Sequence, residues 1–299
     1  MKKFVVLDVS SILYRAFFAL PPFKTKDNKP TGGLYGFLSI LLKIIREIKP
    51  DCILATFDRP EPTFRHKIEV EYKANRPEAP NDLVLQIGYV KEIFQSLNIP
   101  YLEKSGFEAD DIIGFLISKI TDKKLGQVII VTGDSDTFQL LKEGVSVYLL
   151  RKGVKDIQIY DINKFKEDYG GIEPEQLVDV KSLAGEPTDN IKGIEGIGNK
   201  TAIKLIKEYS SVEKLIENAN LLPDNLKEKI IKNKDLILKN KELIKLKKDI
   251  EGINFDIENC FFSLPSPDSV QNIFSKFEFK TLFERYKKIQ QEQSKRTLF

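Results

Sequence analysis

The stretch Val-Ile-Ile-Val-Thr-Gly-Asp-Ser-Asp at residues 128–136 joins an apolar run to two aspartates. Its first part, residues 128–132, predicts a buried strand that ends just before the acidic residues. Two other predicted strands end in the same way, at Leu7-Asp8 and at Phe57-Asp58. One such aspartate would be unremarkable, because Asp often caps the next helix. Ligands of open α/β sheets bind outside the carboxyl ends of strands, so we expect these carboxylates to converge on one edge of a sheet.

Around this stretch, short apolar runs alternate with helical periodicity through residue 172. The predicted strands are 4–7, 52–57, 128–132, 145–149 and 157–160, and the predicted helices are 33–48, 83–97, 107–120 and one after Asp136. The alternation predicts an α/β fold with a mostly parallel central sheet flanked by helices. Helical, lysine-rich sequence comes next: residues 200–248 hold 13 Lys against 7 acidic residues, a net charge of +6 where the whole chain has +3.

The composition is that of a globular protein, with 41% hydrophobic and 30% charged residues in 299. No apolar run approaches the roughly 18 to 20 residues that a membrane helix needs. The start, Met1-Lys2-Lys3 and an apolar stretch, imitates a secretory signal, but Asp8 interrupts it, so we expect mature sequence in the cytoplasm. Cys52 and Cys260 are then expected as two buried thiols rather than a disulfide.

The single histidine, His66, limits the chemistry that is available. A Ser-His-Asp triad would depend on this one residue, which we expect to serve in packing, and the two cysteines cannot form a four-Cys zinc site. Any metal ion must therefore be held by oxygen. Oxygen ligands favour magnesium or manganese, and two such ions are a common device for displacement at phosphorus.

Further carboxylates could join such a site. Glu108, Asp110 and Asp111 lie in the first turn of the predicted helix near residue 107, where helix-dipole complementarity is the alternative explanation. Glu186 and Asp189 lie in a loop beyond the sheet. Carboxylates that share one cleft cannot all ionise without cations, because like charges raise each other's pKa.

Two other segments suggest nucleic acid. Residues 59–82 form a basic, proline-rich excursion whose alternative explanation is a solvated loop. Residues 193–202 join two helical segments through a Gly-hydrophobic-Gly turn. Gly196 and Gly198 leave backbone N–H groups exposed, where they could bind a phosphate, and Lys200 adds a positive charge. This is the helix-hairpin-helix signature of DNA backbone binding.

Together these motifs resemble the 5′ nuclease family, which includes the 5′-3′ exonuclease domain of bacterial DNA polymerase I, stand-alone bacterial and phage 5′ nucleases, and flap endonucleases. The resemblance runs from about residue 4 to at least residue 207. It rests on these segments: 7–8, 14–20, 57–58, 63–65, 72–77, 108–111, 132–136 and the hairpin. It implies a PIN-like α/β nuclease domain over 1–172 with a helical arch at about 59–82, and a helical DNA-binding region over 173–299 with the hairpin at about 190–207.

The resemblance also implies roles for individual residues. The implied ligands of two or more Mg2+ or Mn2+ ions are Asp8, Glu108, Asp110, Asp111, Asp134, Asp136, Glu186 and Asp189, with Glu186 standing where the family usually has Asp. Asp58 would position other groups. Lys73 and Arg76 would contact the scissile phosphate. The implied DNA contacts are Tyr72, stacking on a base, and Gly196, Gly198, Lys200 and Thr201 of the hairpin, where a monovalent cation could also bind.

The implied activity is hydrolysis of a DNA phosphodiester near a junction of single and double strands by a monomer, leaving a 5′-phosphate. Two alternatives stay open: a haloacid-dehalogenase-like phosphatase, whose second Asp would fall at Ser10, and a catalytically inactive DNA-binding module. The ending, with Leu298 and Phe299, is similar to the short peptides by which bacterial replication proteins bind the sliding clamp, although Lys295 and Arg296 depart from them. A tail that packs on its own domain is the alternative there.

Overall fold

The computed structural model describes residues 1–151, 156–258 and 260–296. Its centre is a six-stranded sheet in the order β3-β2-β1-β4-β5-β6. Neighbouring strands are parallel except β6, which is antiparallel to β5. The strands are β1 (Lys2–Asp8), β2 (Cys52–Thr56), β3 (Tyr101–Leu102), β4 (Gly126–Thr132), β5 (Val145–Leu150) and β6 (Ile157–Tyr160). The predicted α/β fold is confirmed; β3, two residues long, had no recognisable sequence pattern.

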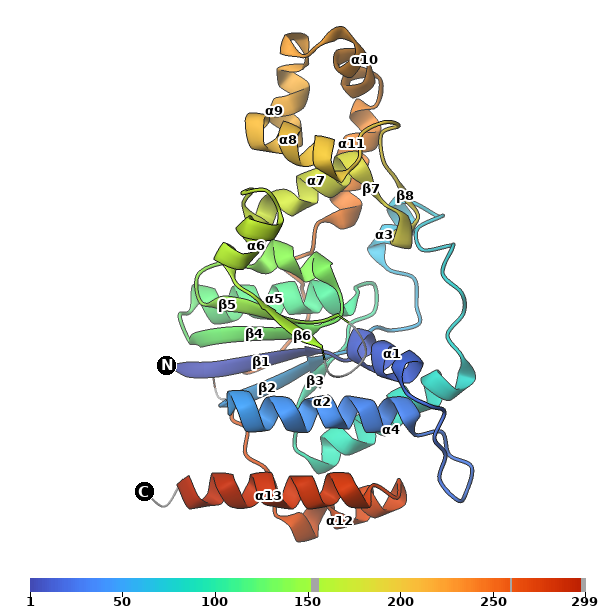
Figure 1. Ribbon diagram of the computed structural model, residues 1–299, viewed down its shortest axis with the longest axis vertical. Coiled ribbons are helices and arrows are strands. Elements are labelled where there is room, and N and C mark those ends of the chain that lie inside the picture. The colour runs from blue at the N-terminus through green and yellow to red at the C-terminus, as the bar shows by residue number, and fades with distance from the viewer. Residues whose placement is uncertain (152–155, 259, 297–299) are drawn as a thin grey trace.

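Helices cover both faces of the sheet (Figure 1). Successive residues of β1 point to opposite faces, so Phe4 and Val6 pack in one core with α5 (Ala109–Asp122). Val5 and Leu7 pack in the other core, with α1 (Val9–Ala19), α2 (Gly32–Ile48) and α4 (Asn81–Ser96). Burial on both faces explains why the strands are continuous apolar runs.

The strand order reverses direction beside β1. From β1 the chain moves outward to β2 and β3, then crosses back to add β4 on the other side. The crevice outside the carboxyl ends of the strands at such a switch point is where open α/β sheets bind ligands. Asp8 ends β1, and Asp134 and Asp136 lie just after β4, so these three acids flank that crevice.

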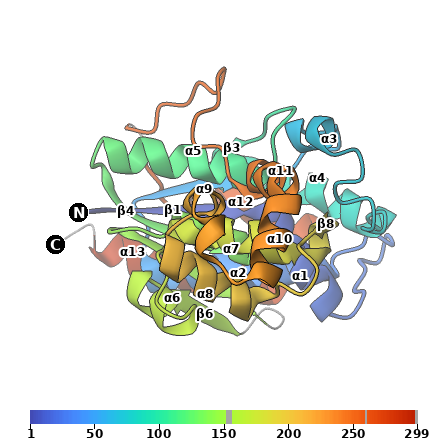
Figure 2. The same cartoon turned by 90° about the horizontal axis from the view of Figure 1, so that it is seen from above.

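A group of helices lies over one side of the sheet (Figure 2). It comprises α6 (Ile162–Asp168), α7 (Leu177–Ala184), α8 (Asn199–Tyr209), α9 (Val212–Glu217), α10 (Asp224–Lys232) and α11 (Lys234–Ile244). Between α7 and α8 the short strands β7 (Gly185–Glu186) and β8 (Ile191–Lys192) form a hairpin. The 3-10 helices are η1 (Ser135–Leu140), where an α-helix was predicted, η2 (Pro174–Gln176), η3 (Pro187–Asp189) and η4 (Ala219–Leu221).

The last two helices lie elsewhere. α12 (Pro267–Lys276) and α13 (Lys280–Arg296) return to the opposite side of the sheet, where their buried residues join the core of α2 (Figure 1). The single helical region expected over residues 173–299 is therefore divided in space. Periodicity alone could not show this, because an amphipathic helix does not specify its packing partner.

The basic excursion contains one short helix, α3 (Phe64–Ile68), followed by turns and an extended segment that leads to α4. In Figure 1 this segment runs from α3 to α4 along one edge of the molecule. His66 packs its ring edge-on against Tyr72 and its Nδ1 lies 3.1 Å from the backbone N of Thr63.

Cys52 and Cys260 are joined in a disulfide, with their Cα atoms 5.6 Å apart. The prediction of two free thiols is therefore wrong. It rested on the compartment expected for the chain, whereas the fold brings the residues together: the segment before α12 crosses the start of β2, where the Phe262 N–H donates to the Asp51 carbonyl at 2.8 Å.

No helix among the described residues is long and apolar enough to cross a bilayer. Leu298 and Phe299, the residues singled out for clamp binding, lie outside the described residues.

Candidate active site

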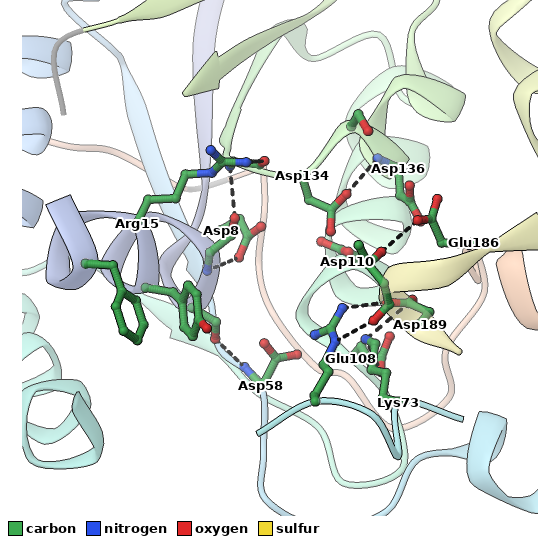
Figure 3. A pocket seen from close by; sticks show the side chains of 18 of the residues that line it. Asp8, Arg15, Asp58, Lys73, Glu108, Asp110, Asp134, Asp136, Glu186 and Asp189 are labelled. Carbon is green, nitrogen blue, oxygen red and sulfur yellow. Dashed lines mark hydrogen bonds and ion pairs between the residues drawn. The ribbon is translucent and has the colours of Figure 1, made fainter. Parts of the chain in front are cut away.

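A cavity of about 1120 Å³ opens at the carboxyl ends of β1 and β4 (Figure 3). Its lining combines acidic side chains from five parts of the chain with several cations. The acidic residues among the described lining are Asp8, Asp58, Glu108, Asp110, Asp134, Asp136, Glu186 and Asp189. The structure thus brings together all the carboxylates singled out in the sequence except Asp111.

Backbone and hydroxyl groups fix the strand-end carboxylates. Asp8 caps α1: one of its oxygens accepts the Ser11 N–H at 3.0 Å, and the other accepts the Thr132 hydroxyl at 2.6 Å. Asp134 begins η1 and accepts the Asp136 N–H at 2.9 Å. These acids therefore stay at the strand ends because each caps the helix that begins there, and each keeps part of its carboxylate toward the cavity.

The first turn of α5 supplies Glu108 and Asp110. Asp58 holds this turn, because its Oδ1 accepts the Ala109 N–H at 2.8 Å while its own N–H donates to Ser10 at 3.1 Å. Asp58 thus ties the end of β2 to the helix that carries two other acids of the cavity.

Asp111 has a different environment from its neighbours. It is fully buried and pairs with both terminal nitrogens of buried Arg65 at 2.7 and 2.9 Å. Its oxygens also accept the N–H groups of Glu108 and Lys247. The implied metal-ligand role of Asp111 is therefore not supported: helix periodicity placed it near Asp110, but the adjacent position turns into the core, and Asp111 is absent from the described cavity lining.

Glu186 and Asp189 are held by the turn between β7 and β8, which contains η3. Glu186 accepts the Thr188 hydroxyl at 2.7 Å and the Lys181 ammonium at 2.6 Å. Lys181 also pairs with Asp136. Lys181 was not predicted as a site residue, because a single lysine in a short helix gives no signal of its own.

The basic excursion places two cations at the cavity. Lys73 Nζ lies 2.7 Å from Glu108 Oε1 and 3.9 Å from Asp189 Oδ2, and Arg76 Nη2 lies 2.5 Å from Asp189 Oδ1. Tyr72, expected to stack on a base, is instead buried, and its hydroxyl donates toward Asp189 at 3.0 Å and Glu108 at 3.1 Å. The structure therefore does not support the stacking role of Tyr72.

Arg15 is a second missed cation of the lining. Its guanidinium donates to the carbonyls of Gly133 and Arg151, and a Cβ at Gly133 would fall 1.8 Å from Arg15 Nε. The glycine in the stretch 128–136 is thus needed for close approach of Arg15 to the turn that carries Asp134.

Crowding of acids shifts their protonation. Burial, followed by the charge of Asp58, raises the pKa of Asp8 to about 7. Burial, followed by the charges of Asp8 and Asp134, also raises the pKa of Asp110. Such paired shifts in one cleft are typical of functional sites.

The two acids that pair with Lys181 have pKa values that shift in opposite directions. Burial and then Asp134 raise the pKa of Asp136 to about 7, against the opposing charge of Lys181. Burial alone would raise the pKa of Glu186, but the Lys181 charge and hydrogen bond hold it below its usual range. The cleft thus needs cations, and side-chain ammonium groups supply part of them.

The candidate ligands have the right chemistry for a hard divalent cation, because all of them are carboxylate oxygens. As the side chains stand, however, no three His, Cys, Asp or Glu residues of the described part converge closely enough to hold a metal ion. Lys73 and Lys181 each lie between two of the acids.

The helix-hairpin-helix turn lies beyond the cavity, before α8. Ile194 and Ile197 are buried and fix the turn, while Gly196, Gly198 and Lys200 are exposed. Gly196 has a φ of +79°, which favours glycine. The Glu195 carbonyl accepts the Lys229 ammonium at 3.0 Å, so a side-chain cation already lies where a monovalent ion was considered.

The chain is similar in sequence to bacterial DNA polymerases I and to a bacterial 5′-3′ exonuclease. The chain is 42% identical over 238 residues to DNA polymerase I of Caldicellulosiruptor bescii, an overlap of 78% of this chain and 28% of that protein. It is 42% identical over 218 residues to a 5′-3′ exonuclease of Aquifex aeolicus, covering 73% of each. The chain thus spans roughly a quarter of the length of the DNA polymerase I relatives that it matches.

The fold is also that of solved structures. A T5 5′-exonuclease structure with bound zinc superimposes with a TM-score of 0.68 at 21% identity, over 95% of this chain and 100% of that chain. Residues 3–170 match the family described as 5′-3′ exonuclease, N-terminal resolvase-like domain, and residues 172–269 match its C-terminal SAM fold. With the acid-lined switch point and the hairpin, these matches lead to one conclusion: the chain belongs to the 5′-3′ exonuclease family.

Proposed function

We propose that the chain hydrolyses DNA phosphodiesters as a metal-dependent, structure-specific 5′ nuclease at junctions of single-stranded and duplex DNA, with both exonuclease and flap endonuclease action. The observation that carries the proposal is the convergence of eight acidic side chains with Lys73 and Arg76 on one cavity. A solved structure of the same fold, the T5 D15 flap endonuclease, is a complex with DNA and metal ions. Family membership sets aside the phosphatase alternative.

In the proposed reaction water adds to phosphorus and the P–O3′ bond breaks, leaving a 5′-phosphate and a 3′-hydroxyl. Two or more Mg2+ or Mn2+ ions held by the cavity carboxylates would activate the water and stabilise the charge on the phosphoryl group. The metal-ligand proposal includes Asp8, Glu108, Asp110, Asp134, Asp136, Glu186 and Asp189. Asp58 positions the start of α5 through the Ala109 N–H.

The cations of the basic excursion act on the phosphoryl oxygens. Lys73 and Arg76 both line the cavity, and each pairs there with an acid, Lys73 with Glu108 and Arg76 with Asp189. Cations fixed where negative charge develops stabilise the transition state more than the bound substrate. The duplex is held separately by the hairpin, through the backbone at Gly196 and Gly198 and the side chains of Lys200 and Thr201.

The test is cleavage of end-labelled flapped, nicked and blunt duplexes by the chain and by Asp134→Asn. The wild type should cleave the flap and nick substrates in Mg2+ and none in chelator. Asp134→Asn should lose about 1000-fold or more in rate and keep DNA affinity within about threefold, because chemistry depends on the ions and affinity on phosphate contacts. Cleavage by Asp134→Asn within about tenfold of wild type would refute the metal assignment.

We also propose, from the chain's ending, that the monomer is tethered to a sliding clamp by Leu298 and Phe299, which would raise its effective concentration on DNA. Clamp binding should be detectable for the full chain and lost when it ends at Arg296. Equal affinities would remove the clamp from the proposal.

A further inference from the structure

Lys181 is a cation of the cavity lining that is enclosed between two acids. Its side chain is 13% exposed, and its ammonium lies between Asp136 and Glu186, with Glu186 Oε2 at 2.6 Å. It reaches this place from α7, whereas its partners come from η1 and from β7. One lysine thus links the strand-end part of the cleft to the hairpin part.

The contacts leave little room for a second cation in this half of the cleft. Asp136 Oδ1 pairs with Lys181, and Glu186 uses Oε2 for Lys181 and Oε1 for the Thr188 hydroxyl. Glu186 is one methylene longer than the Asp of the family pattern, which extends its carboxylate toward the ammonium. A divalent ion placed between the same two acids would lie next to the positively charged Lys181 ammonium. The repulsion between these two cations strongly disfavours their binding at the same time.

We propose that Lys181 is a resident counter-ion that competes with divalent metal for Asp136 and Glu186, so that an ion enters this half only when the ammonium leaves. This inference rests on the proposed function. The flexible lysine stem allows the ammonium to move while α7 stays packed through its buried residues Leu177, Val180 and Leu183. It also accounts for the acids having the right chemistry for metal without converging on one point.

Lys241 provides a matched control. Its ammonium also lies between two acids, Asp179 at 2.6 Å and Glu213 at 2.8 Å, but it is absent from the described lining of the cavity. Removing either ammonium therefore breaks a similar pair of contacts, while only Lys181 faces the proposed metal site.

The first test is Mn2+ binding by calorimetry, without DNA, for the wild type, Lys181→Met, Lys181→Arg and Lys241→Met. Lys181→Met should tighten the weakest Mn2+ site by about tenfold or more, because the competing charge is gone. Lys181→Arg and Lys241→Met should match the wild type. A Lys181→Met isotherm equal to or weaker than that of the wild type would overturn the proposal.

The second test needs no substitution at the site. Amine acetylation of the wild-type chain, monitored residue by residue by mass spectrometry, should show Lys181 reacting at least about fivefold faster with saturating Mn2+ than with chelator, because the released ammonium becomes accessible. Lys241 should react equally in both. An unchanged Lys181 rate would also overturn the competition.

These outcomes separate the two proposals. If the wild type cleaves flapped DNA with Mg2+ but Lys181 responds to neither test, the nuclease stands and the competition fails. If the wild type binds no Mn2+ and cleaves no substrate, the proposed function itself fails.

Discussion

At the scale of the residue, the surroundings of each carboxylate determine its charge. Asp8 is almost fully buried at the end of β1, and burial raises its pKa to about 7, with Asp58 adding to the effect. Its pKa is therefore higher in the folded chain than in the unfolded chain, where it is near 3.8. The contribution of this carboxyl to the stability of the fold is fully present at a pH below 3.8, the pKa in the unfolded chain. It is lost as the pH rises through about 7, the pKa in the folded chain.

This sign gives a prediction for Asp8→Asn in the presence of chelator. Asparagine resembles the neutral acid at every pH, so the variant should melt close to the wild type at pH 4 and several degrees higher at pH 8. Thermal unfolding followed by circular dichroism at pH 4, 6 and 8 measures the difference. A gap between the two proteins that does not widen with pH would contradict the raised pKa.

The pair of Arg65 and Asp111 leads to a second prediction, about stability alone. Both side chains are buried, so removing one leaves the other charged without a partner. Arg65→Met should cost about 3 to 5 kcal/mol in the free energy of unfolding, and Arg65→Met with Asp111→Leu should cost less than Arg65→Met alone. Urea denaturation measures both.

The control for this prediction is Lys164→Met. Lys164 forms ion pairs with Glu167 and Asp168 at the surface, where solvent screens the charges, so these pairs should add little to stability. If Arg65→Met cost no more than this surface substitution, Asp111 would be available for another role, including metal binding.

At the scale of the element, the sequence predicted the features that depend on local pattern. Five apolar runs became strands, and the acids that follow three of them met at one cavity, because parallel strands of one sheet end at one edge. It did not predict α1, which starts directly after Asp8, or β3, which is only two residues long. Asp111 and Lys181 could not be assigned, because their partners, Arg65 and Asp136, are 46 and 45 residues away.

In the hairpin before α8, an effect of a substitution on DNA binding can be separated from an effect on folding. Gly198 has an ordinary φ of −89°, and a Cβ there would meet no described atom within 4 Å. The fold itself therefore does not require glycine at this position, in contrast to Gly196. A glycine that is dispensable for folding fits close approach by a partner from outside.

Gly198→Val should accordingly keep the melting temperature of the wild type and weaken binding to duplex-containing substrates about tenfold, because the side chain blocks the backbone N–H groups. Fluorescence anisotropy with duplex and single-stranded oligonucleotides measures this. Gly88→Val is the matched control, since that position of α4 is also open. Weaker binding to single strands alone would argue against the hairpin as the duplex contact.

At the scale of the whole molecule, the chain crosses the sheet more than once. It builds the sheet, forms the helices over one side and then returns past the start of β2 to place α12 and α13 against α2. The disulfide between Cys52 and Cys260 closes this return over a separation of 208 residues. Such a pairing leaves no trace in local sequence, because nothing near either cysteine specifies the other.

The disulfide makes a prediction about stability without an effect on chemistry. A cross-link over so long a loop restricts the unfolded chain, so reduction should lower the free energy of unfolding by about 2 to 5 kcal/mol. Neither cysteine lines the acidic cavity among the described residues, so flap cleavage below the melting temperature should be unchanged. Thermal unfolding with and without dithiothreitol measures the effect, and Cys260→Ser, which has no disulfide to reduce, should melt at one temperature in both buffers. If the wild type also melts at one temperature in both, the cross-link does not stabilise the return of α12 and α13.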